Sequence, residues 1–336
     1  MTPPPITDDL GRTVNYMRLS VTDRCNLRCS YCRVGGGPVL PHKDIMRYEE
    51  MVELAKLAQS LNIAKLRLTG GEPFARPGFP KLLEMLAQSC PGLDVRITTN
   101  GTLLKGMPRL LMELGITRIN ISLDSLNPDT FKDITGHDLF HTVRAAVDEC
   151  LEHGLKVKLN VVALKGVNDS ELPAFLDLAM AQPLDLRFIE FMPMGQSQRQ
   201  DEQYWSSDQI VASAGKLVDL TPIDRKSADS GPAQLFSLTG PQGPGKGRLG
   251  VISPLSHHFC STCNRLRITS SGRLRTCLFS DREYRLLPLL RSPQHGPETV
   301  LRVIRLATQK KPLGYQLLRD KIGPRVCAKA MSAIGG

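Results

Sequence analysis

Short runs of aliphatic and β-branched residues alternate with longer amphipathic stretches over the first 195 residues of the chain. The runs fall at residues 15–21, 65–70, 94–100, 118–124, 157–162 and 186–192. Between them apolar residues recur at helical spacing, as Met51, Leu54 and Leu57 do, which is typical of a helix with one buried face. Strands that alternate with helices pair in parallel through right-handed crossovers. The pattern therefore predicts an α/β fold, a partial (βα)6 barrel of the TIM type.

The pattern changes after residue 195. Residues 227–250 are rich in Gly, Pro and Ser, a composition that predicts loops and short antiparallel strands. We therefore expect two domains. Residues 1–195 form the barrel core, and residues 196–336 form a C-terminal α+β layer.

Four motifs stand where predicted strands end. They are "TGGEP" (69–73), "TTNG" (98–101), "SLD" (122–124) and "FMP" (191–193). In a barrel of this kind ligands bind at the carboxyl ends of the strands. The motifs are therefore predicted to share one rim of the barrel and to line its site.

The composition sets the cellular context of the chain. No apolar run is long enough to cross a bilayer, and the N-terminus lacks the pattern of a secretion signal. We expect a cytoplasmic enzyme without a membrane partner. Its nine cysteines are then predicted to be thiols, not disulfides. Six of them form two tight groups, which indicates metal binding, whereas Cys90, Cys150 and Cys327 are scattered and are expected to be buried.

The first thiol group is Cys25, Cys29 and Cys32, in the segment "DRCNLRCSYC". A structural zinc site requires four ligands, as does a fully coordinated iron–sulfur cluster. Three thiolates can instead hold three irons of a four-iron cluster and leave the fourth iron open to a small chelating molecule. Zinc with a histidine from elsewhere in the chain is the alternative.

The spacing Cys-x3-Cys-x2-Cys, together with "TGGEP" after the second strand, resembles the radical S-adenosylmethionine superfamily. The resemblance implies a 4Fe–4S cluster whose open iron binds S-adenosylmethionine, and cleavage of the latter to a 5′-deoxyadenosyl radical. It also implies contacts of S-adenosylmethionine with residues at the strand ends. We assign these contacts to Tyr31, Gly71, Ser122 and Met192, with Asn100 as a further polar candidate.

The second thiol group is Cys260, Cys263 and Cys277, with the spacing Cys-x2-Cys-x13-Cys. It again contains three thiols. His257 and His258 lie nearby in the sequence, so the spacing alone leaves a zinc site with a histidine ligand open.

The segment "LGVISPLSHHFCSTCNRLRITSSGRLRTCL" (249–278) resembles the C-terminal signature of the GTP 3′,8-cyclase family, and shorter matches run along nearly the whole chain. The resemblance implies a second 4Fe–4S cluster whose open iron contacts guanine. It implies a lyase that abstracts the C3′ hydrogen of GTP and forms (8S)-3′,8-cyclo-7,8-dihydroguanosine 5′-triphosphate, in the first step of molybdenum cofactor biosynthesis. A homodimer, a flavodoxin or ferredoxin electron donor, and cyclic pyranopterin monophosphate synthase as the downstream enzyme are implied as well.

A net charge of +10 indicates an anionic partner, either nucleic acid or a phosphorylated small molecule. Aromatic residues make up 5% of the chain and tryptophan occurs once, which argues against the stacking surfaces of a nucleic-acid binder. A triphosphate requires several convergent cations. The residues that the family resemblance assigns to GTP are Arg18, Arg67, Thr98, Lys158, Arg265 and Arg267.

The chain departs from the family pattern at two places. Arg33 and Val34 follow the third thiol where Met-Pro is expected, and Tyr315 stands where His is expected. The terminal Gly335 and Gly336 match a tail that reaches the active-site region in the family. Another radical enzyme with an auxiliary cluster, such as one that modifies peptides, is the alternative function.

Overall fold

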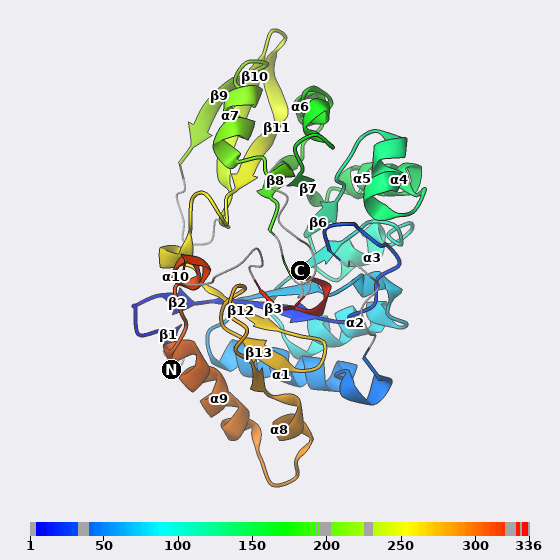
Figure 1. The fold of residues 1–336 in the computed structure, drawn as a ribbon. Helices are drawn as coiled ribbons and strands as arrows, with labels where there is room; N and C mark the ends of the chain where they lie inside the picture. Colours follow the sequence, from blue (N-terminus) through cyan, green and yellow to red (C-terminus); the bar gives the residue numbers. More distant parts are fainter. Residues whose placement is uncertain are drawn as a thin grey trace.

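The computed structural model (Figure 1) describes residues 5–32, 40–192, 194, 203–224, 231–319, 327–329 and 331–334. Its main feature is a 12-stranded sheet in the order β14-β13-β12-β3-β4-β5-β6-β7-β8-β11-β10-β9. A separate antiparallel pair joins β1 (Ile6–Thr7) and β2 (Thr13–Val14) near the N-terminus. The predicted domain boundary at residues 195 and 196, the Arg33–Val34 segment and the Gly335–Gly336 tail lie outside the described residues.

Six parallel strands form the centre of the sheet, each hydrogen-bonded to the next. They are β3 (Tyr16–Ser20), β4 (Lys65–Thr69), β5 (Asp94–Thr99), β6 (Arg118–Ser122), β7 (Lys156–Ala163) and β8 (Asp185–Glu190). All six lie where the sequence predicted them. The α/β class with an open, barrel-like parallel sheet is thereby confirmed.

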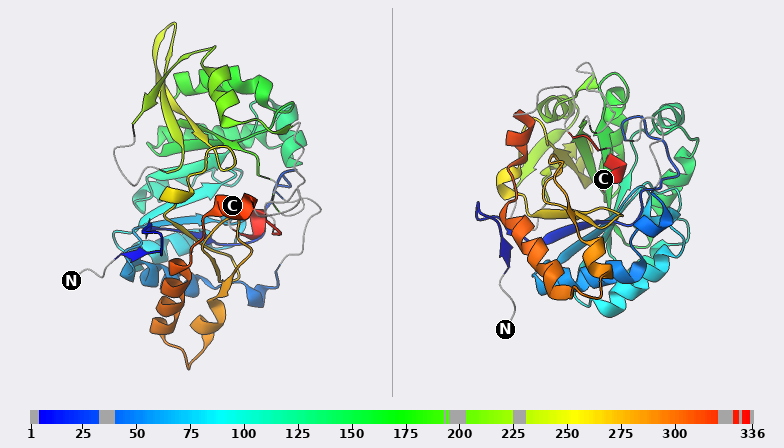
Figure 2. Two further views of the ribbon diagram at one scale, coloured as in Figure 1. Left: turned by 60° about the vertical axis from the view of Figure 1, so that its left-hand side comes forward. Right: turned by 60° about the horizontal axis from the view of Figure 1, so that its bottom comes forward.

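Helices that follow the strands cover the outer face of the curved sheet (Figure 2). They are α1 (Tyr48–Ser60), α2 (Phe79–Ser89), α3 (Pro108–Glu113), α4 (Pro128–Thr135), α5 (Phe140–Glu152) and α6 (Leu172–Ala181). Gly115 and Gly154, with φ of +74° and +77°, follow the ends of α3 and α5, where their left-handed backbone stops the helix.

Alternation along the central strands separates two environments. Leu66, Leu68 and Leu159 belong to the large apolar core, whereas Arg67 and Lys158 alternate with them and lie on the opposite, inner face. One face of the sheet thus packs against helices, and the other presents polar side chains to the interior.

The C-terminal strands extend the same sheet at both edges. β11 (Gly243–Ile252) pairs in parallel with β8, and β12 (Arg265–Ile268) pairs in parallel with β3. Beyond them β10 (Gln234–Gly240), β9 (Asp219–Ile223), β13 (Arg273–Arg275) and β14 (Tyr284–Arg285) are antiparallel to their neighbours. The predicted short antiparallel strands are present, but they complete the barrel sheet instead of forming a sheet of their own.

The remaining elements surround this sheet. The helices are α7 (Ser207–Ala214), α8 (Leu287–Arg291), α9 (Pro297–Gln309) and α10 (Gly314–Arg319). The 3-10 turns are η2 (His42–Asp44), η3 (Pro73–Ala75), η4 (Asp169–Glu171), η6 (Cys260–Thr262) and η7 (Met331–Ala333). Among the described residues, no helix has the length and apolarity needed to span a membrane.

A second, smaller apolar cluster holds the described C-terminal residues in place. It consists of Met194, Phe279, Cys327 and Ile334, and η7 lies over the middle of the curved sheet in two views (Figures 1 and 2). Cys327 is buried here, and Cys90 and Cys150 are buried in the large core, as predicted for the three scattered cysteines.

Candidate active site

A row of arginines crosses four neighbouring strands on the inner face of the sheet. Arg267 of β12 lies opposite Arg18 of β3. Arg18 lies opposite Arg67 of β4, and Arg67 opposite Arg96 of β5. Paired positions of adjacent strands project to the same face. Three of these arginines were predicted from the sequence, and Arg96 was not.

A second row continues across the next strands. Thr98 of β5 lies opposite Asn120 of β6, and Asn120 lies opposite Lys158 of β7. Lys158 in turn lies opposite Asp185 of β8. Lys158 Nζ lies 3.8 Å from the Asp185 carboxylate. That carboxylate also lies 3.4 Å from Arg187 and 2.7 Å from Arg248. One carboxylate therefore faces three cations, and positive charge remains in excess.

Crowding of these cations changes their protonation equilibria. Burial and then Arg267 lower the pKa of Arg18 well below its usual range, and burial and then Arg187 lower the pKa of Lys158 to about 7. The buried Nε atoms of Arg18 and Arg187 have no hydrogen-bond partner among the described residues. Buried donors without partners are costly, so this surface is suited to a strongly anionic ligand.

Arg67 and Arg265 complete the predicted set. Arg67 donates from Nε to the hydroxyl of Tyr16 and from a terminal nitrogen to Thr98 Oγ1, at 3.2 Å. Arg265 is close enough to lower the pKa of both Arg18 and Arg267. The structure thus brings the six residues predicted to contact GTP together on one face.

The first thiol group follows β3. Cys25, Cys29 and Cys32 are all partly exposed. Burial raises the pKa of Cys29, and Asp124, Cys32 and Cys25 raise it further. The three sulfur atoms are therefore close enough to interact electrostatically, as a shared cluster requires.

The "TGGEP" turn packs directly against the thiol loop. A Cβ on Gly71 would lie 2.0 Å from the carbonyl oxygen of Arg24, and a Cβ on Gly70 would lie 2.4 Å from that of Thr22. Gly71 N donates to the Thr22 carbonyl at 2.8 Å. Gly71 was predicted from the family resemblance to contact S-adenosylmethionine. In the structure the group that approaches most closely is the backbone of the thiol loop.

Glu72, the next residue of that turn, joins two of the predicted motifs. Its buried carboxylate accepts hydrogen bonds from Thr99 Oγ1 at 2.7 Å, from Asn100 N at 2.6 Å and from Phe74 N at 3.0 Å. It therefore fixes the "TTNG" strand end beside the thiol loop. Asn100 Nδ2 lies 3.7 Å from Cys25 Sγ.

The other residues predicted to bind S-adenosylmethionine lie on three separate parts of the sheet and its loops. Tyr31 lies inside the thiol loop and donates from its hydroxyl to Asp124, just beyond the end of β6. Ser122 is the last residue of β6. Met192 follows β8 and packs against the small C-terminal apolar cluster, which Cys277 also contacts. Met192 is thus placed toward the second thiol group.

The second thiol group is Cys260 and Cys263, around η6, with Cys277 after β13. Burial raises the pKa of Cys263, but Lys311 and Arg265 outweigh it and bring that pKa down to about 7. Lys311 also donates to the carbonyl oxygens of Arg265 and Thr276. A buried cation therefore favours the thiolate form that metals bind.

The N-terminal segment and α10 enclose this second group. Arg12 donates to the Cys260 carbonyl at 2.7 Å and to the Lys311 carbonyl at 2.6 Å. A Cβ on Gly314, the first residue of α10, would lie 3.0 Å from Cys277 Sγ and 3.5 Å from Cys260 Sγ. The start of α10 thus lies directly against two of the thiols.

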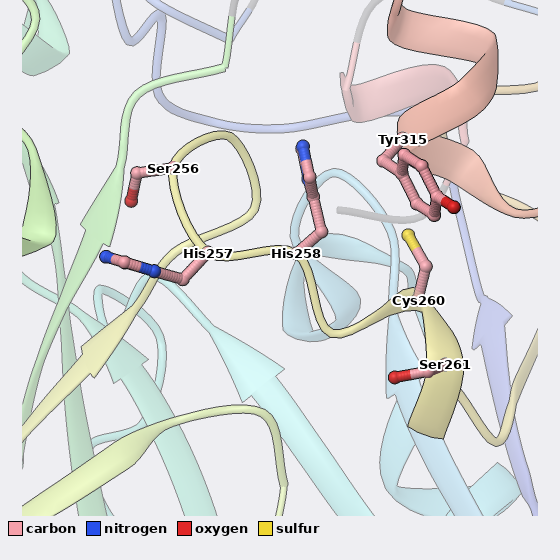
Figure 3. A pocket seen from close by; sticks show the side chains of 6 residues that line it. All are labelled: Ser256, His257, His258, Cys260, Ser261 and Tyr315. Atoms are coloured by element: carbon pink, nitrogen blue, oxygen red, sulfur yellow. The ribbon is translucent and has the colours of Figure 1, made fainter.

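A cavity of about 380 Å³ lies beside Cys260 (Figure 3). The rings of His258 and Tyr315 stack across it with centroids 5.5 Å apart, so Tyr315, which replaces the expected His, has an aromatic partner. His258 Nδ1 lies 2.9 Å from the Pro254 carbonyl, and His257 Nε2 lies 2.9 Å from Asp208. Each histidine thus has one ring nitrogen engaged by oxygen.

The structure holds the thiols of each group near one another without grouping them around one metal position. Within the part of the chain that the structure describes, no three His, Cys, Asp or Glu side chains are placed to hold one metal ion. This finding applies to a zinc ion and to an iron–sulfur cluster alike.

Several residues of the site were missed by the sequence analysis. Arg96 could have been found, because it lies on a predicted strand two residues from Thr98, which was assigned to the site. Glu72 and Asp124 belong to the predicted motifs "TGGEP" and "SLD", but their roles depend on partners far away in the sequence. Arg187 and Lys311 had no comparable signal, because their partners were not predicted.

Comparison with known proteins agrees with the geometry. Residues 19–179 match the Radical SAM superfamily, and residues 184–317 match the family Molybdenum Cofactor Synthesis C. The GTP 3′,8-cyclase of Alkaliphilus oremlandii is 41% identical over 98% of this chain and 99% of its own length. That of Moorella thermoacetica is also 41% identical, with the same coverage. That of Rhizobium etli is 38% identical over 99% of this chain and 94% of its own.

Solved structures confirm the fold. Streptococcus suis SuiB bound to the precursor peptide SuiA has a TM-score of 0.63 at 12% identity, covering 93% of this chain and 74% of that one. SuiB bound to S-adenosylmethionine has a TM-score of 0.60 at 12% identity, with coverages of 95% and 75%. These likenesses concern the fold alone, whereas the full-length sequence matches define the family. The chain belongs to the GTP 3′,8-cyclase family of the radical S-adenosylmethionine superfamily.

Proposed function

We propose that this enzyme converts GTP to (8S)-3′,8-cyclo-7,8-dihydroguanosine 5′-triphosphate, the first step of molybdenum cofactor biosynthesis. The observation that carries the proposal is the row of four arginines on the inner face of the sheet, with Lys158 and Arg187 on the strands beyond it. The buried Nε atoms of Arg18 and Arg187 have no partner among the described residues. Two of the strands that carry the four arginines adjoin the thiol groups. Arg18 on β3 precedes Cys25 in the chain, and Arg265 on β12 follows Cys263.

The family implies a 4Fe–4S cluster and S-adenosylmethionine, and the first thiol group fits them. It offers three mutually interacting soft donors, Cys25, Cys29 and Cys32, and iron–sulfur clusters bind through cysteine thiolates. When bound, the cluster would supply a low-potential electron, and S-adenosylmethionine would supply the radical that this electron generates. The chain's part is to hold the three thiols in one loop, which the Gly71 and Glu72 backbones anchor through Thr22 and Arg24.

We assign S-adenosylmethionine to the strand ends above this loop. Gly71 follows the end of β4 and Ser122 ends β6. Tyr31 belongs to the thiol loop itself, and Met192 offers an apolar surface at the cluster that Cys277 also contacts. Asn100, fixed by Glu72 and placed beside Cys25, is the additional polar contact. Positioning a reactive group in this way is the protein's main contribution to such chemistry.

We assign a second 4Fe–4S cluster to Cys260, Cys263 and Cys277, with its open iron facing guanine. Three thiols, a buried Lys311 and the close packing of Gly314 support this assignment. The residues fit a cluster with one vacant corner, because this group, like the first, offers three thiols close together in the sequence pattern.

The triphosphate is assigned to Arg18, Arg67, Thr98, Lys158, Arg265 and Arg267. Each charged hydrogen bond contributes about 1.5–3 kcal/mol, so four or five can hold the ligand against the loss of its hydration. Arg187 joins this set on the strength of its buried, unpaired Nε. A peptide-modifying enzyme would have no need of such a row, which is why GTP is the better substrate.

Anaerobic incubation with GTP, S-adenosylmethionine and a reductant, followed by mass analysis, tests the function. We expect the cyclised triphosphate and one 5′-deoxyadenosine per turnover, with about eight irons per chain, four for each cluster. A Cys25→Ala variant should form neither product. Unchanged GTP beside cleaved S-adenosylmethionine would contradict the proposed substrate.

We further propose that the chain divides into two domains at residues 195 and 196 and that Gly335 and Gly336 reach the active site. We also propose a cytoplasmic homodimer that receives electrons from flavodoxin or ferredoxin and passes its product to cyclic pyranopterin monophosphate synthase.

A further inference from the structure

We propose that Tyr16 is a positioning residue of the triphosphate site, where its phenol holds Arg67 and its ring separates the surrounding cations. The inference rests on the proposed binding of GTP. It adds a residue that neither the motifs nor the family resemblance assigned.

The position of Tyr16 in the sheet places it among the cations. It lies on β3, 8% exposed, opposite Arg265 on one side and Lys65 on the other. It is two residues from Arg18 and shares its face. Tyr16 thus lies between Arg265 and Lys65 in a row that runs parallel to the row of four arginines.

The hydroxyl of Tyr16 fixes one guanidinium. It accepts a hydrogen bond from Arg67 Nε, while a terminal nitrogen of the same guanidinium donates to Thr98 Oγ1 at 3.2 Å and to the Ile97 carbonyl at 3.4 Å. Held by acceptors on two strands, the planar group loses its rotational freedom before any ligand arrives. Such pre-organisation lowers the entropic cost of binding.

The ring of Tyr16 contacts three cations at once. Lys65 Nζ lies 5.5 Å from the ring centroid, Arg265 Cζ 5.7 Å and Arg67 Cζ 5.9 Å. All three lie within the range of cation–π attraction. The ring therefore offsets the mutual repulsion of like charges, which would otherwise drive these side chains apart in the free enzyme.

The same cations act on the phenol proton. Burial raises the pKa of Tyr16, but Arg67, Arg18 and Arg265 outweigh it and bring the pKa down to about 7. Above pH 7 the phenolate is then an internal counter-ion of the free site. The negative charge of a bound triphosphate raises the phenol pKa again, so binding takes up a proton and the affinity for GTP falls as the pH rises from 7.

The test compares Tyr16→Phe with Tyr48→Phe in the reconstituted holoenzyme. Tyr48 is a matched control, because its hydroxyl also makes one hydrogen bond, to the Pro77 carbonyl at 2.8 Å, and its ring also faces an arginine, Arg76, at 4.3 Å. It lies at the start of α1, on the outer layer. Thermal unfolding of both variants checks that each is folded.

For Tyr16→Phe at pH 6, where the phenol is neutral, we expect the KM for GTP to rise about tenfold, as for one lost charged hydrogen bond, with kcat within about twofold of wild type. The affinity for guanosine, which lacks the triphosphate, should not change. Between pH 7 and 8.5 the slope of the logarithm of GTP affinity against pH should become shallower, by an amount that corresponds to the uptake of at most one proton. Tyr48→Phe should match the wild type in all three measurements.

Two results would overturn the inference while leaving the proposed function intact. One is an unchanged KM and pH slope in Tyr16→Phe, and the other is a fall in kcat at constant KM. If the wild-type enzyme binds no GTP, the proposed function fails and this inference fails with it.

Discussion

Tyr31 donates a hydrogen bond of 2.5 Å from its hydroxyl to Oδ2 of Asp124, 93 residues further along the chain. The other carboxylate oxygen of Asp124 accepts from Val162 N at 2.8 Å. Asp124 therefore ties the first thiol loop to β7 across the end of β6. The loop that presents Cys29 and Cys32 is held by a residue of the sheet as well as by its own turns.

The link between Tyr31 and Asp124 should matter for the radical reaction. For Asp124→Ala we expect S-adenosylmethionine cleavage to slow by about tenfold, because the thiol loop loses a charge-assisted hydrogen bond. Tyr31→Phe removes the same bond from the other side and should have a similar effect. Formation of 5′-deoxyadenosine measures the rate, and Asp129→Ala, at an exposed position in the first turn of α4, is the control. A wild-type rate in both variants would show that the bond does not position the loop.

Removal of one arginine from the row should separate substrate binding from radical generation. For Arg267→Ala, and likewise Arg265→Ala, we expect GTP turnover to be lost, because a charged donor worth about 1.5–3 kcal/mol disappears from a site where burial excludes replacement by water. Cleavage of S-adenosylmethionine should partly persist. Arg285→Ala, on the exposed edge strand β14, controls for net charge. Normal GTP turnover in both variants would rule out the triphosphate assignment.

Lys158 should make GTP binding dependent on pH. Burial and then Arg187, Arg67 and Arg96 lower the pKa of Lys158 to about 7, while Asp185 acts in the opposite direction. Below pH 7 the free enzyme already carries the charge. Above pH 7 Lys158 is neutral in the free enzyme. The triphosphate is fully ionised beyond a phosphate pKa of about 6, so its binding requires Lys158 to take up a proton. The affinity for GTP is therefore lost as the pH rises through 7, by about tenfold per unit for each proton taken up.

Equilibrium binding of GTP between pH 7 and 8.5 measures this linkage. In Lys158→Met the slope of log affinity against pH should be shallower by up to one proton, whereas exposed Lys216→Met should keep the wild-type slope. An identical slope in Lys158→Met would show that Lys158 does not change protonation on binding.

Gly314 should be essential for the second cluster. A side chain there meets Phe279 at 2.8 Å and Cys277 Sγ at 3.0 Å, both tighter than ordinary van der Waals contact. For Gly314→Val we expect about four irons per chain in place of about eight, with S-adenosylmethionine cleavage retained and GTP turnover lost. Gly231→Val, where an added Cβ meets nothing within 4 Å, is the control. Full iron content in Gly314→Val would contradict the placement of the cluster.

The sequence by itself determined the central strands and helices, the two thiol groups and most of the cationic site. These features depend on local patterns. Alternation of apolar and polar residues along Tyr16–Ser20 or Lys156–Ala163 decides which side chains face the helices. Cysteine spacing within one loop requires no knowledge of distant contacts.

Only the tertiary structure decided how distant segments meet. Strand register aligned Arg267, Arg18, Arg67 and Arg96 into one row, and the parallel pairing of β11 and β12 made the C-terminal strands part of the barrel sheet. Lys311 reached Cys263, and Asp124 reached Tyr31, across long stretches of chain. The physical reason is that register and packing depend on the burial of whole elements against each other, which no local pattern encodes.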